Sequence, residues 1–304
     1  MQSPIYHYEG DGSPISISPK PYSLAVFLIL AFGISWAVWV PAALASYDFI
    51  RFQINPFLTG LLGAIGPSLA ALITTAAYDG RDGFRGLFKR LLTWRIGLQW
   101  YLFALAWPVV LSLTKTGISI LLGSPIPNFS QPPFVNLFPE LLNATPLVFL
   151  PAFFLQQLLF GSSMGEEFGW RGFALPRLQF KKSSLNASLL LGLIWGTWHL
   201  PLWLTKGNLV QDGFIGWHFL ELMATALLFT WVYNNTQGSL LLALLFHASI
   251  GVTGLFLSSA ELHPLIGATL NWGMAGLVIR VFGYQRLARQ NMDLSALQSG
   301  LLAK

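Results

Sequence analysis

The 304-residue sequence contains no cysteine and few charged residues. Without cysteine there is no disulfide framework, no thiolate nucleophile and no cysteine-ligated metal site. Charged residues make up only 10% of the chain, against about 25% in a typical soluble domain. Hydrophobic residues make up 54%. This composition excludes an ordinary soluble domain and indicates a polytopic protein integral to a membrane.

Acidic residues are scarcer than basic ones, with 12 Asp and Glu against 17 Lys and Arg. Basic residues gathered in the cytoplasmic loops of a membrane protein account for this excess, so the net positive charge does not call for a nucleic-acid partner. Residues 1–22 lack a basic segment followed by an apolar core. They therefore predict a short, disordered cytoplasmic tail rather than a cleaved signal peptide.

Apolar runs of about 20 residues, long enough to cross a bilayer as a helix, recur along the chain. Eight such runs predict an all-α, polytopic bundle of about eight transmembrane spans, forming one membrane-embedded domain over residues 23–282. A second cytoplasmic tail is expected over 283–304. The runs cover residues 23–45, 57–78, 100–122, 146–175, 186–205, 213–233, 239–257 and 264–282. Between the second and third runs, the helical apolar pattern of the basic stretch 79–99 predicts an interfacial helix.

Lysine and arginine are distributed unevenly between the loops. Five lie in 79–99 and three more lie between the fourth and fifth runs, whereas the long loop 123–143 has none. Basic loops tend to stay in the cytoplasm. With eight spans, we therefore expect both termini in the cytoplasm and the loop 123–143 on the far side of the membrane.

Two adjacent carboxylates and an arginine end the fourth run, in Gly-Glu-Glu-Phe-Gly-Trp-Arg from Gly165 to Arg171. Charges at bilayer depth are costly, and those that persist usually mark function. On a helix Glu167 and Arg171 are four residues apart and share a face, so we expect an ion pair. Glu166 points about 100° away and stays available for chemistry. The alternative is a cytoplasmic helix end whose charged side chains reach into water.

Two histidines lie in later apolar runs, His199 in the fifth and His247 in the seventh. A rise of 1.5 Å per residue puts Glu166, His199 and His247 at depths of roughly 14, 20 and 12 Å from the expected cytoplasmic helix ends. A lone buried histidine is usually a packing residue, but similar depths on three helices favour one polar site.

Such a site has two chemical uses. A glutamate and a histidine can activate a water molecule for attack on a peptide carbonyl, while a second histidine stabilises the oxyanion. The same side chains are also ordinary zinc ligands, so a divalent metal bound by Glu166, His199 and His247 is an open alternative. The HExxH spacing of soluble zinc proteases is absent, so no local motif decides between the two.

The order of these motifs resembles the CPBP (Abi) family, which includes the CAAX prenyl endopeptidases that process Ras-like proteins and prokaryotic members linked to bacteriocin immunity or maturation. The resemblance covers residues 165–251. It rests on Glu-Glu-Phe-Gly-Trp-Arg-Gly-Phe from Glu166, Trp-His-Leu-Pro-Leu from Trp198, and Gly-Ser-Leu-Leu-Leu-Ala-Leu-Leu-Phe-His-Ala from Gly238.

The resemblance implies an intramembrane endopeptidase of a prokaryotic plasma membrane, acting on a peptide or protein substrate. In that family pattern Glu166 and His199 activate the water, and Glu167 and Arg171 support the site.

One position departs from the family pattern. Its third motif has Asn or another polar residue four positions after the histidine, where this chain has Gly251. Glycine has no side chain to donate a hydrogen bond to an oxyanion, so Ser249, Thr253 or a water molecule would have to replace it. We therefore keep a second hypothesis, a non-catalytic membrane protein of the same fold that binds a peptide, a lipid or a protein partner.

Four further polar residues have structural interpretations. Gln156 and Gln157 are expected to face the bundle interior or a cavity without a catalytic role. His218 and Glu221 are three residues apart in the sixth run and predict a structural hydrogen bond, with the polar lining of a cavity as the alternative. Intramembrane Glu and His also serve proton relays, which leaves a transporter as a weaker third hypothesis.

Overall fold

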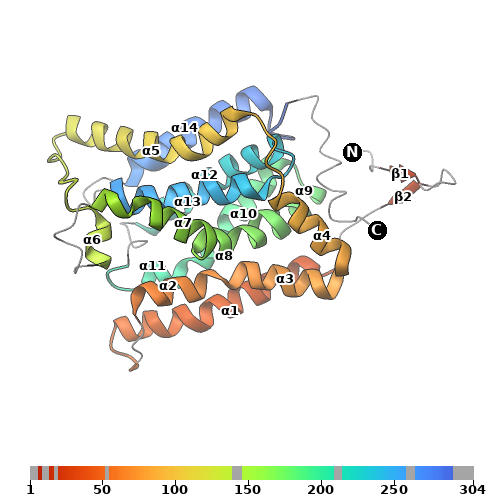
Figure 1. The fold of residues 1–304 in the computed structure, drawn as a ribbon, viewed down its shortest axis with the longest axis horizontal. Coiled ribbons are helices and arrows are strands. Elements are labelled where there is room, and N and C mark those ends of the chain that lie inside the picture. Colours follow the sequence, from red (N-terminus) through yellow and green to blue (C-terminus); the bar gives the residue numbers. More distant parts are fainter. Residues whose placement is uncertain are drawn as a thin grey trace.

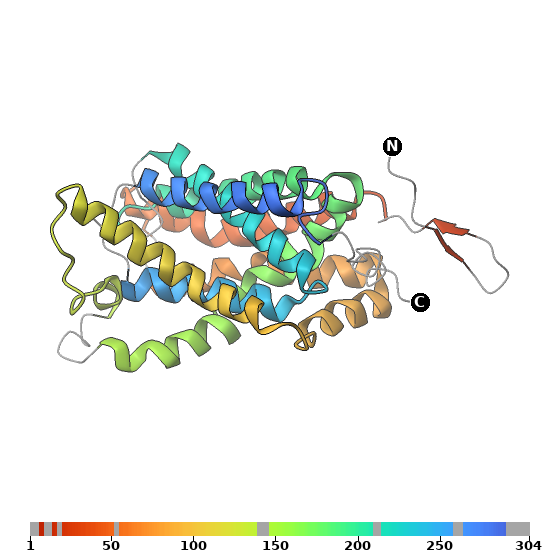
Figure 2. The ribbon, with the colours of Figure 1, turned by 90° about the horizontal axis from the view of Figure 1, so that it is seen from above.

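The apolar runs of the sequence fold into helices that lie side by side along one common direction (Figures 1 and 2). The computed structural model describes residues 6–8, 14–16, 20–51, 55–138, 146–208, 214–257 and 264–289. Two short strands, β1 (Tyr6–Tyr8) and β2 (Pro14–Ser16), pair in antiparallel fashion near the N-terminus. The remaining elements are helical.

The first half of the chain contains α1 (Ser23–Ser46), α2 (Pro56–Ala64), α3 (Gly66–Tyr78), α4 (Gly80–Leu91), α5 (Leu98–Leu121) and α6 (Pro133–Leu137). The second half contains the 3₁₀ helix η2 (Pro146–Phe149), α7 (Leu150–Leu159), α8 (Ser162–Gly169), the π-helix η3 (Trp170–Ala174), α9 (Leu175–Lys181), α10 (Ser184–Trp198), α11 (Leu200–Leu204), α12 (Ile215–Asn235), α13 (Leu240–Leu257) and α14 (Pro264–Phe282).

Seven helical segments of the described residues are long and apolar enough to cross a membrane, which confirms the all-α, polytopic fold class. The one expected run that is not among these seven is the fifth, 186–205, which folds as two shorter helices, α10 and α11, that meet at His199. Pro201 explains the break, because its ring removes one backbone donor and clashes with the carbonyl four residues earlier. Together α10 and α11 still extend from Ser184 to Leu204.

The fourth run is interrupted, whereas the sequence predicts one helix over 146–175. Helix α7 ends at Leu159, and α8 begins at Ser162 after the extended residue Gly161. The Gln157 side-chain oxygen accepts the Ser162 backbone N–H at 3.3 Å and so caps the new helix. From there α8, η3 and α9 continue without a gap to Lys181.

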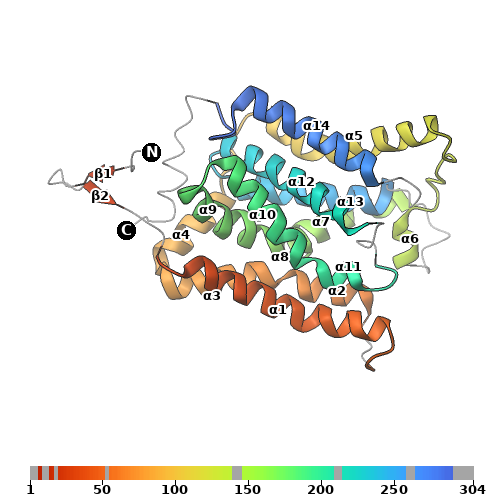
Figure 3. The ribbon, with the colours of Figure 1, turned by 180° about the vertical axis from the view of Figure 1, so that it is seen from behind.

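The bundle has two edges and a centre (Figures 1 and 3). Helices α1, α2 and α3 run along one edge, and α5 and α14 run along the opposite one. Helix α13 lies between them and packs against α5, α7, α8 and α12. This central position means that side chains on different faces of α13 enter different compartments of the bundle.

The interfacial helix expected in 79–99 is α4. Its Arg81, Arg85 and Lys89 are exposed, as expected for a basic surface helix. Arg90 is buried instead and donates to the Tyr233 hydroxyl at 2.8 Å and to the Gly172 carbonyl at 2.9 Å. Similarly, Arg177 is buried against Asp79, with 2.5 Å between nitrogen and oxygen. Both arginines therefore hold helices together rather than facing the cytoplasm freely.

Several expectations concern segments that fall partly outside the described residues. These are most of the tail 1–22, residues 290–304 of the second tail, and residues 139–145 of the loop 123–143. The domain boundaries and the position of each terminus relative to the membrane stay predictions.

Candidate active site

Two glycines bring α8 into close contact with the α2–α3 region. A Cβ atom at Gly165 would lie 2.5 Å from the Ala64 carbonyl oxygen, and one at Gly169 would lie 2.6 Å from Pro67. Small residues four positions apart are a common way for helices to approach closely in membranes. With this face of α8 against α2 and α3, the carboxylates of Glu166 and Glu167 meet partners on α10 and α13.

Glu167 is held by two partners through one oxygen. Its Oε1 accepts from Arg171 Nη1 at 2.9 Å and lies 2.6 Å from His247 Nδ1. The ion pair expected from the four-residue spacing is thus present, and both of its side chains are completely buried. The Arg171 guanidinium also lies over the rings of Phe229, at 3.8 Å, and Trp195, at 4.7 Å. Cation–π contacts of this kind offset part of the cost of burying the charge.

Glu166 is 2% exposed and is held differently. Its Oε2 accepts from the indole Nε1 of Trp195 at 2.7 Å and of Trp170 at 3.3 Å. Its Oε1 lies 3.9 Å from His247 Nε2, which is too long for a direct hydrogen bond. A single water molecule can bridge such a gap. One carboxylate oxygen is therefore fixed and the other faces an imidazole.

The partner of Nδ1 sets the proton position on each histidine when the ring is neutral. An ionised carboxylate and a backbone carbonyl only accept hydrogen bonds. His247 therefore donates from Nδ1 to Glu167, and His199 donates from Nδ1 to the Trp195 carbonyl at 2.9 Å. In both rings this leaves Nε2 as the acceptor, the form that can take a proton from water.

His199 reaches this cluster through Trp195. Within the described residues it has no hydrogen bond or ion pair to either carboxylate. The Trp195 ring contacts both histidines, with centroids 5.6 Å from His199 and 5.9 Å from His247. The structure thus places Glu166, Glu167, Arg171 and His247 in one cluster. His199 lies next to this cluster and contacts it through the Trp195 ring.

Sequence reasoning gave no role in the chemistry of this site to two of its residues, Trp195 and His218. The His218 ring meets the His199 ring edge-on with centroids 5.8 Å apart, and its Nε2 is buried without a hydrogen-bond partner. The spacing of Trp195, four residues before His199, signals that the two share a helix face. Measured from Tyr233, the predicted cytoplasmic end of the sixth run, His218 lies roughly 22 Å deep, close to the depth of His199. Extending the depth comparison to every intramembrane histidine would have found it.

Comparison with known proteins agrees with these motifs. Residues 143–253, which contain both carboxylates and both histidines, match the family described as Type II CAAX prenyl endopeptidase Rce1-like. The chain is 26% identical over 273 residues to CAAX prenyl protease 2 of Methanococcus maripaludis, covering 86% of this chain and 95% of that protein. Both matches agree with the resemblance of this chain to the CPBP family.

A second similarity is weaker. The chain is 25% identical over 252 residues to Lysostaphin resistance protein A of Staphylococcus haemolyticus, covering 82% of this chain and 61% of that protein. The family match and the archaeal relative, together with the seven apolar helices, indicate an integral membrane protein and support a function as an intramembrane protease. The non-catalytic hypothesis is not favoured.

At Gly251, where the sequence departs from the CPBP pattern, a side chain from another helix occupies the adjacent space. A Cβ atom at Gly251 would lie 2.7 Å from Nε2 of Gln157, so the glycine leaves room for this amide from α7. The two residues expected to substitute for the missing side chain point elsewhere. Ser249 donates to the Leu105 carbonyl at 2.8 Å, and Thr253 lines a separate cavity. The polar group closest to the family position is therefore Gln157.

The metal alternative requires at least three suitable side chains close together. No group of three His, Cys, Asp or Glu side chains in the described ranges of the chain is arranged to hold a metal ion. Glu166 and His247 are close, but Glu167 is occupied by Arg171 and His199 lies beyond Trp195. As they stand, these described side chains do not form a metal site.

Proposed function

We propose that this protein is an intramembrane endopeptidase that hydrolyses a peptide bond of a membrane-associated substrate with a water molecule activated by Glu166. The observation that carries the proposal is the unequal use of the two carboxylates. Glu167 forms an ion pair with Arg171 and a hydrogen bond with His247. Glu166 instead has one carboxylate oxygen, Oε1, that faces His247 Nε2 at 3.9 Å. A general base needs such a free oxygen within reach of the water that it deprotonates.

In the proposed reaction the water lies between Glu166 Oε1 and His247 Nε2. Glu166 takes one proton as the water oxygen attacks the carbonyl carbon, and the nitrogen of the breaking C–N bond later receives that proton. His247 accepts the second water hydrogen and so orients the attacking oxygen. After the C–N bond breaks, one proton remains on the new carboxyl group, and His199, whose ring contacts the same Trp195 ring as His247, is the base that we assign to take it.

The negative charge that develops on the carbonyl oxygen needs a hydrogen-bond donor, and we assign this role to Gln157. Its Oε1 is committed to the Ser162 N–H, which turns its NH₂ group toward Gly251 on the helix that carries His247. Donors aimed at a developing oxyanion commonly contribute about 10²–10³ in rate. This assignment supplies the polar group that the sequence lacks at Gly251.

The substrate class follows from the name of the archaeal relative, a CAAX prenyl protease. We propose a protein or peptide whose lipid-modified C-terminal segment enters the bundle from the bilayer. The test is cleavage of an internally quenched peptide with a prenylated cysteine by the purified protein in liposomes. Wild type should cleave it, Glu166→Gln should not, and Asp82→Asn on the surface helix α4 should behave as wild type. Equal cleavage by wild type and Glu166→Gln would overturn the proposal.

The assignment of Gln157 has its own matched test. Gln157→Ala should lower kcat by about 100-fold while leaving the protein folded. Adding Gly251→Asn to that variant puts an amide back into the space that Gln157 vacates, and it should restore part of kcat. Gly251→Asn in the wild-type background should instead displace the flexible end of Gln157 and change little. No loss in Gln157→Ala, or no recovery in the double variant, would remove Gln157 from the mechanism.

A further inference from the structure

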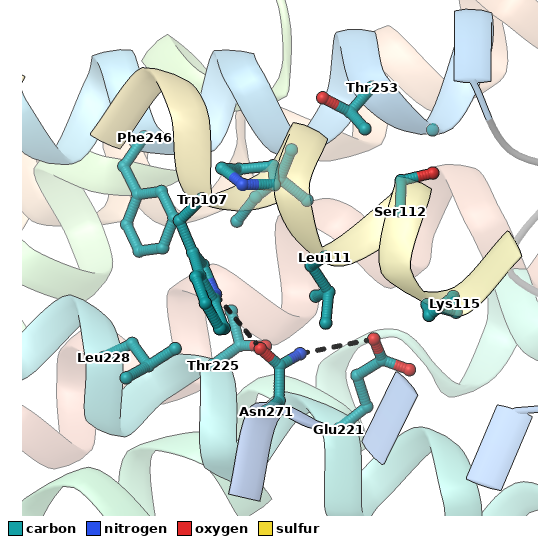
Figure 4. Close-up of a pocket in the computed structure, with 13 residues that line it drawn as sticks. Trp107, Leu111, Ser112, Lys115, Glu221, Thr225, Leu228, Phe246, Thr253 and Asn271 are labelled. Atoms are coloured by element: carbon teal, nitrogen blue, oxygen red, sulfur yellow. Dashed lines mark hydrogen bonds between the residues drawn. The ribbon is translucent and has the colours of Figure 1, made fainter. Parts of the chain in front are cut away.

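A second polar cluster lies away from the candidate active site, in a cavity of about 190 Å³ between α5, α12, α13 and α14 (Figure 4). Helix α13 contributes Phe246, Ile250 and Thr253, which share a different face from His247. The cavity is therefore separated from the carboxylates of Glu166 and Glu167 by α13 itself. Nothing in the proposed hydrolysis uses it.

Three polar side chains meet in this cavity at one depth. Lys115 lies six residues before the end of α5 at Leu121, and Glu221 lies six residues after the start of α12 at Ile215. Asn271 lies seven residues after the start of α14. At 1.5 Å per residue all three lie roughly 9–10 Å below the ends of their helices. These ends belong to the side of the membrane that the basic loops predict to be the outer one.

The carboxylate in the cavity has a fixed orientation. Trp107 Nε1 donates to Asn271 Oδ1 at 3.3 Å, and Asn271 Nδ2 donates to Glu221 Oε1 at 3.4 Å, as Figure 4 shows. This chain of hydrogen bonds joins α5, α14 and α12. A carboxylate offers about four acceptor sites on its two oxygens, so Glu221 can accept from an ammonium group in addition to the partners that it has in the protein.

The cation in the cavity is not satisfied by the protein. Within the described residues, the Lys115 ammonium has no hydrogen bond or ion pair. Its side chain extends past Gly267, where a Cβ atom would lie 2.8 Å from Nζ. An unpaired charge at this depth is costly and usually marks a site for a ligand of opposite sign. The hydroxyls of Ser112 and Thr253 lie in the same cavity and can also donate to an anion.

We propose that this cavity binds the headgroup of phosphatidylethanolamine from the outer leaflet, with the phosphate against Lys115 and the primary ammonium against Glu221. A primary ammonium donates three hydrogen bonds, which suits the Glu221 carboxylate and the Thr225 hydroxyl that lines the same cavity. A trimethylammonium group cannot donate any. An anionic headgroup without an amine would bring its phosphate close to a carboxylate.

A lipid is the favoured source of this phosphoethanolamine group. Helices α5 and α14 form one edge of the bundle in Figures 1 and 3, so the cavity between them lies near the lipid-facing surface. Exposed apolar side chains continue along this edge, namely Val110 and Leu113 on α5 and Leu265 on α14. Acyl chains of a lipid whose headgroup enters the cavity would lie against them.

The test measures which lipid stays bound to the purified, delipidated protein. The protein is equilibrated with equal amounts of phosphatidylethanolamine, phosphatidylcholine and phosphatidylglycerol with the same acyl chains, and bound lipid is read by native mass spectrometry. One phosphatidylethanolamine per chain should be retained, with a preference of about tenfold or more over each of the others. Lys115→Met should abolish retention, and Glu221→Gln should abolish the preference for the amine.

Two control variants separate a specific loss of binding from a general loss of charge or of folding. Arg51→Gln removes one exposed positive charge at the same predicted side of the membrane and should retain the lipid. Thr225→Val removes one proposed hydrogen-bond partner without changing charge and should weaken retention even if Glu221→Gln folds poorly. Equal retention of phosphatidylglycerol, or unchanged retention in Lys115→Met, overturns the proposal. Displacement of the lipid by soluble glycerophosphoethanolamine at equal concentration would assign the cavity to a free metabolite and overturn the lipid source.

Discussion

Replacing each adjacent carboxylate by glutamine should separate chemistry from structural support. In Glu166→Gln the side-chain oxygen still accepts from Trp195 and Trp170, and the new NH₂ group faces His247. No buried indole N–H loses its acceptor, so the free energy of unfolding should change by less than about 1 kcal/mol. Cleavage should nevertheless fall by about 100-fold or more, because the amide cannot act as a general base.

Glu167→Gln should have the opposite profile. It removes the anion from a fully buried ion pair, which typically costs about 3–5 kcal/mol. We expect the lower end of that range, because the glutamine oxygen still accepts from Arg171 and the Glu166 carboxylate remains next to it in sequence. About 3 kcal/mol corresponds to a decrease in Tm of roughly 6–12 °C for a protein somewhat smaller than this one.

The assay compares Tm in detergent with the rate of cleavage of the quenched peptide. Glu166→Leu serves as the control for the hydrogen-bond argument. It removes the acceptor of two buried indole groups and should cost about 1–3 kcal/mol for each of them. If Glu166→Gln melts early while Glu167→Gln is stable and inactive, the two carboxylates have been assigned to the wrong roles.

Three further predictions test the rest of the site and the topology. His218→Phe keeps the ring contact with His199 and should lower cleavage by about tenfold with an altered pH profile, whereas an unchanged profile would reduce His218 to packing. A reporter fused after Lys304 should be cytoplasmic, and a periplasmic or extracellular signal would contradict the orientation. Metal analysis should find less than one equivalent of zinc per purified chain, because the described side chains do not assemble three metal ligands. One equivalent of metal in the wild type that is lost in Glu166→Gln would support the metal hypothesis instead.

Short-range regularities of the sequence predicted much of the fold and the ion pair at its centre. The length and composition of the apolar runs specify membrane helices, and the spacing of Glu167 and Arg171 specifies a shared helix face. The shared depth of Glu166 and His247 also follows from the helical rise alone, and the structure brings these two side chains to 3.9 Å. Such features need no knowledge of how the helices pack.

Features set by packing between helices were not predictable in this way. The role of Trp195 as hydrogen-bond donor to Glu166 depends on the rotation of α10 relative to α8, which the sequence does not specify. The burial of Arg90 and Arg177 depends on acceptors far away in the chain, such as Tyr233 and Asp79. Their charge alone gave the expectation of free cytoplasmic residues.

The candidate site coincides with three irregularities of the helices, and each has a consequence for the chemistry. The break at Gly161 turns the Gln157 amide toward Gly251, and the break before Pro201 ends α10 at the turn that carries His199. The π-helix η3 begins at Trp170, whose indole supports Glu166, and includes Arg171. Within a bilayer such departures from regular helix are tolerated only where protein surrounds them. A buried polar cluster therefore needs the enclosing helices α1, α12 and α13, and a substitution that loosens their packing should weaken the chemistry without touching any of the polar side chains.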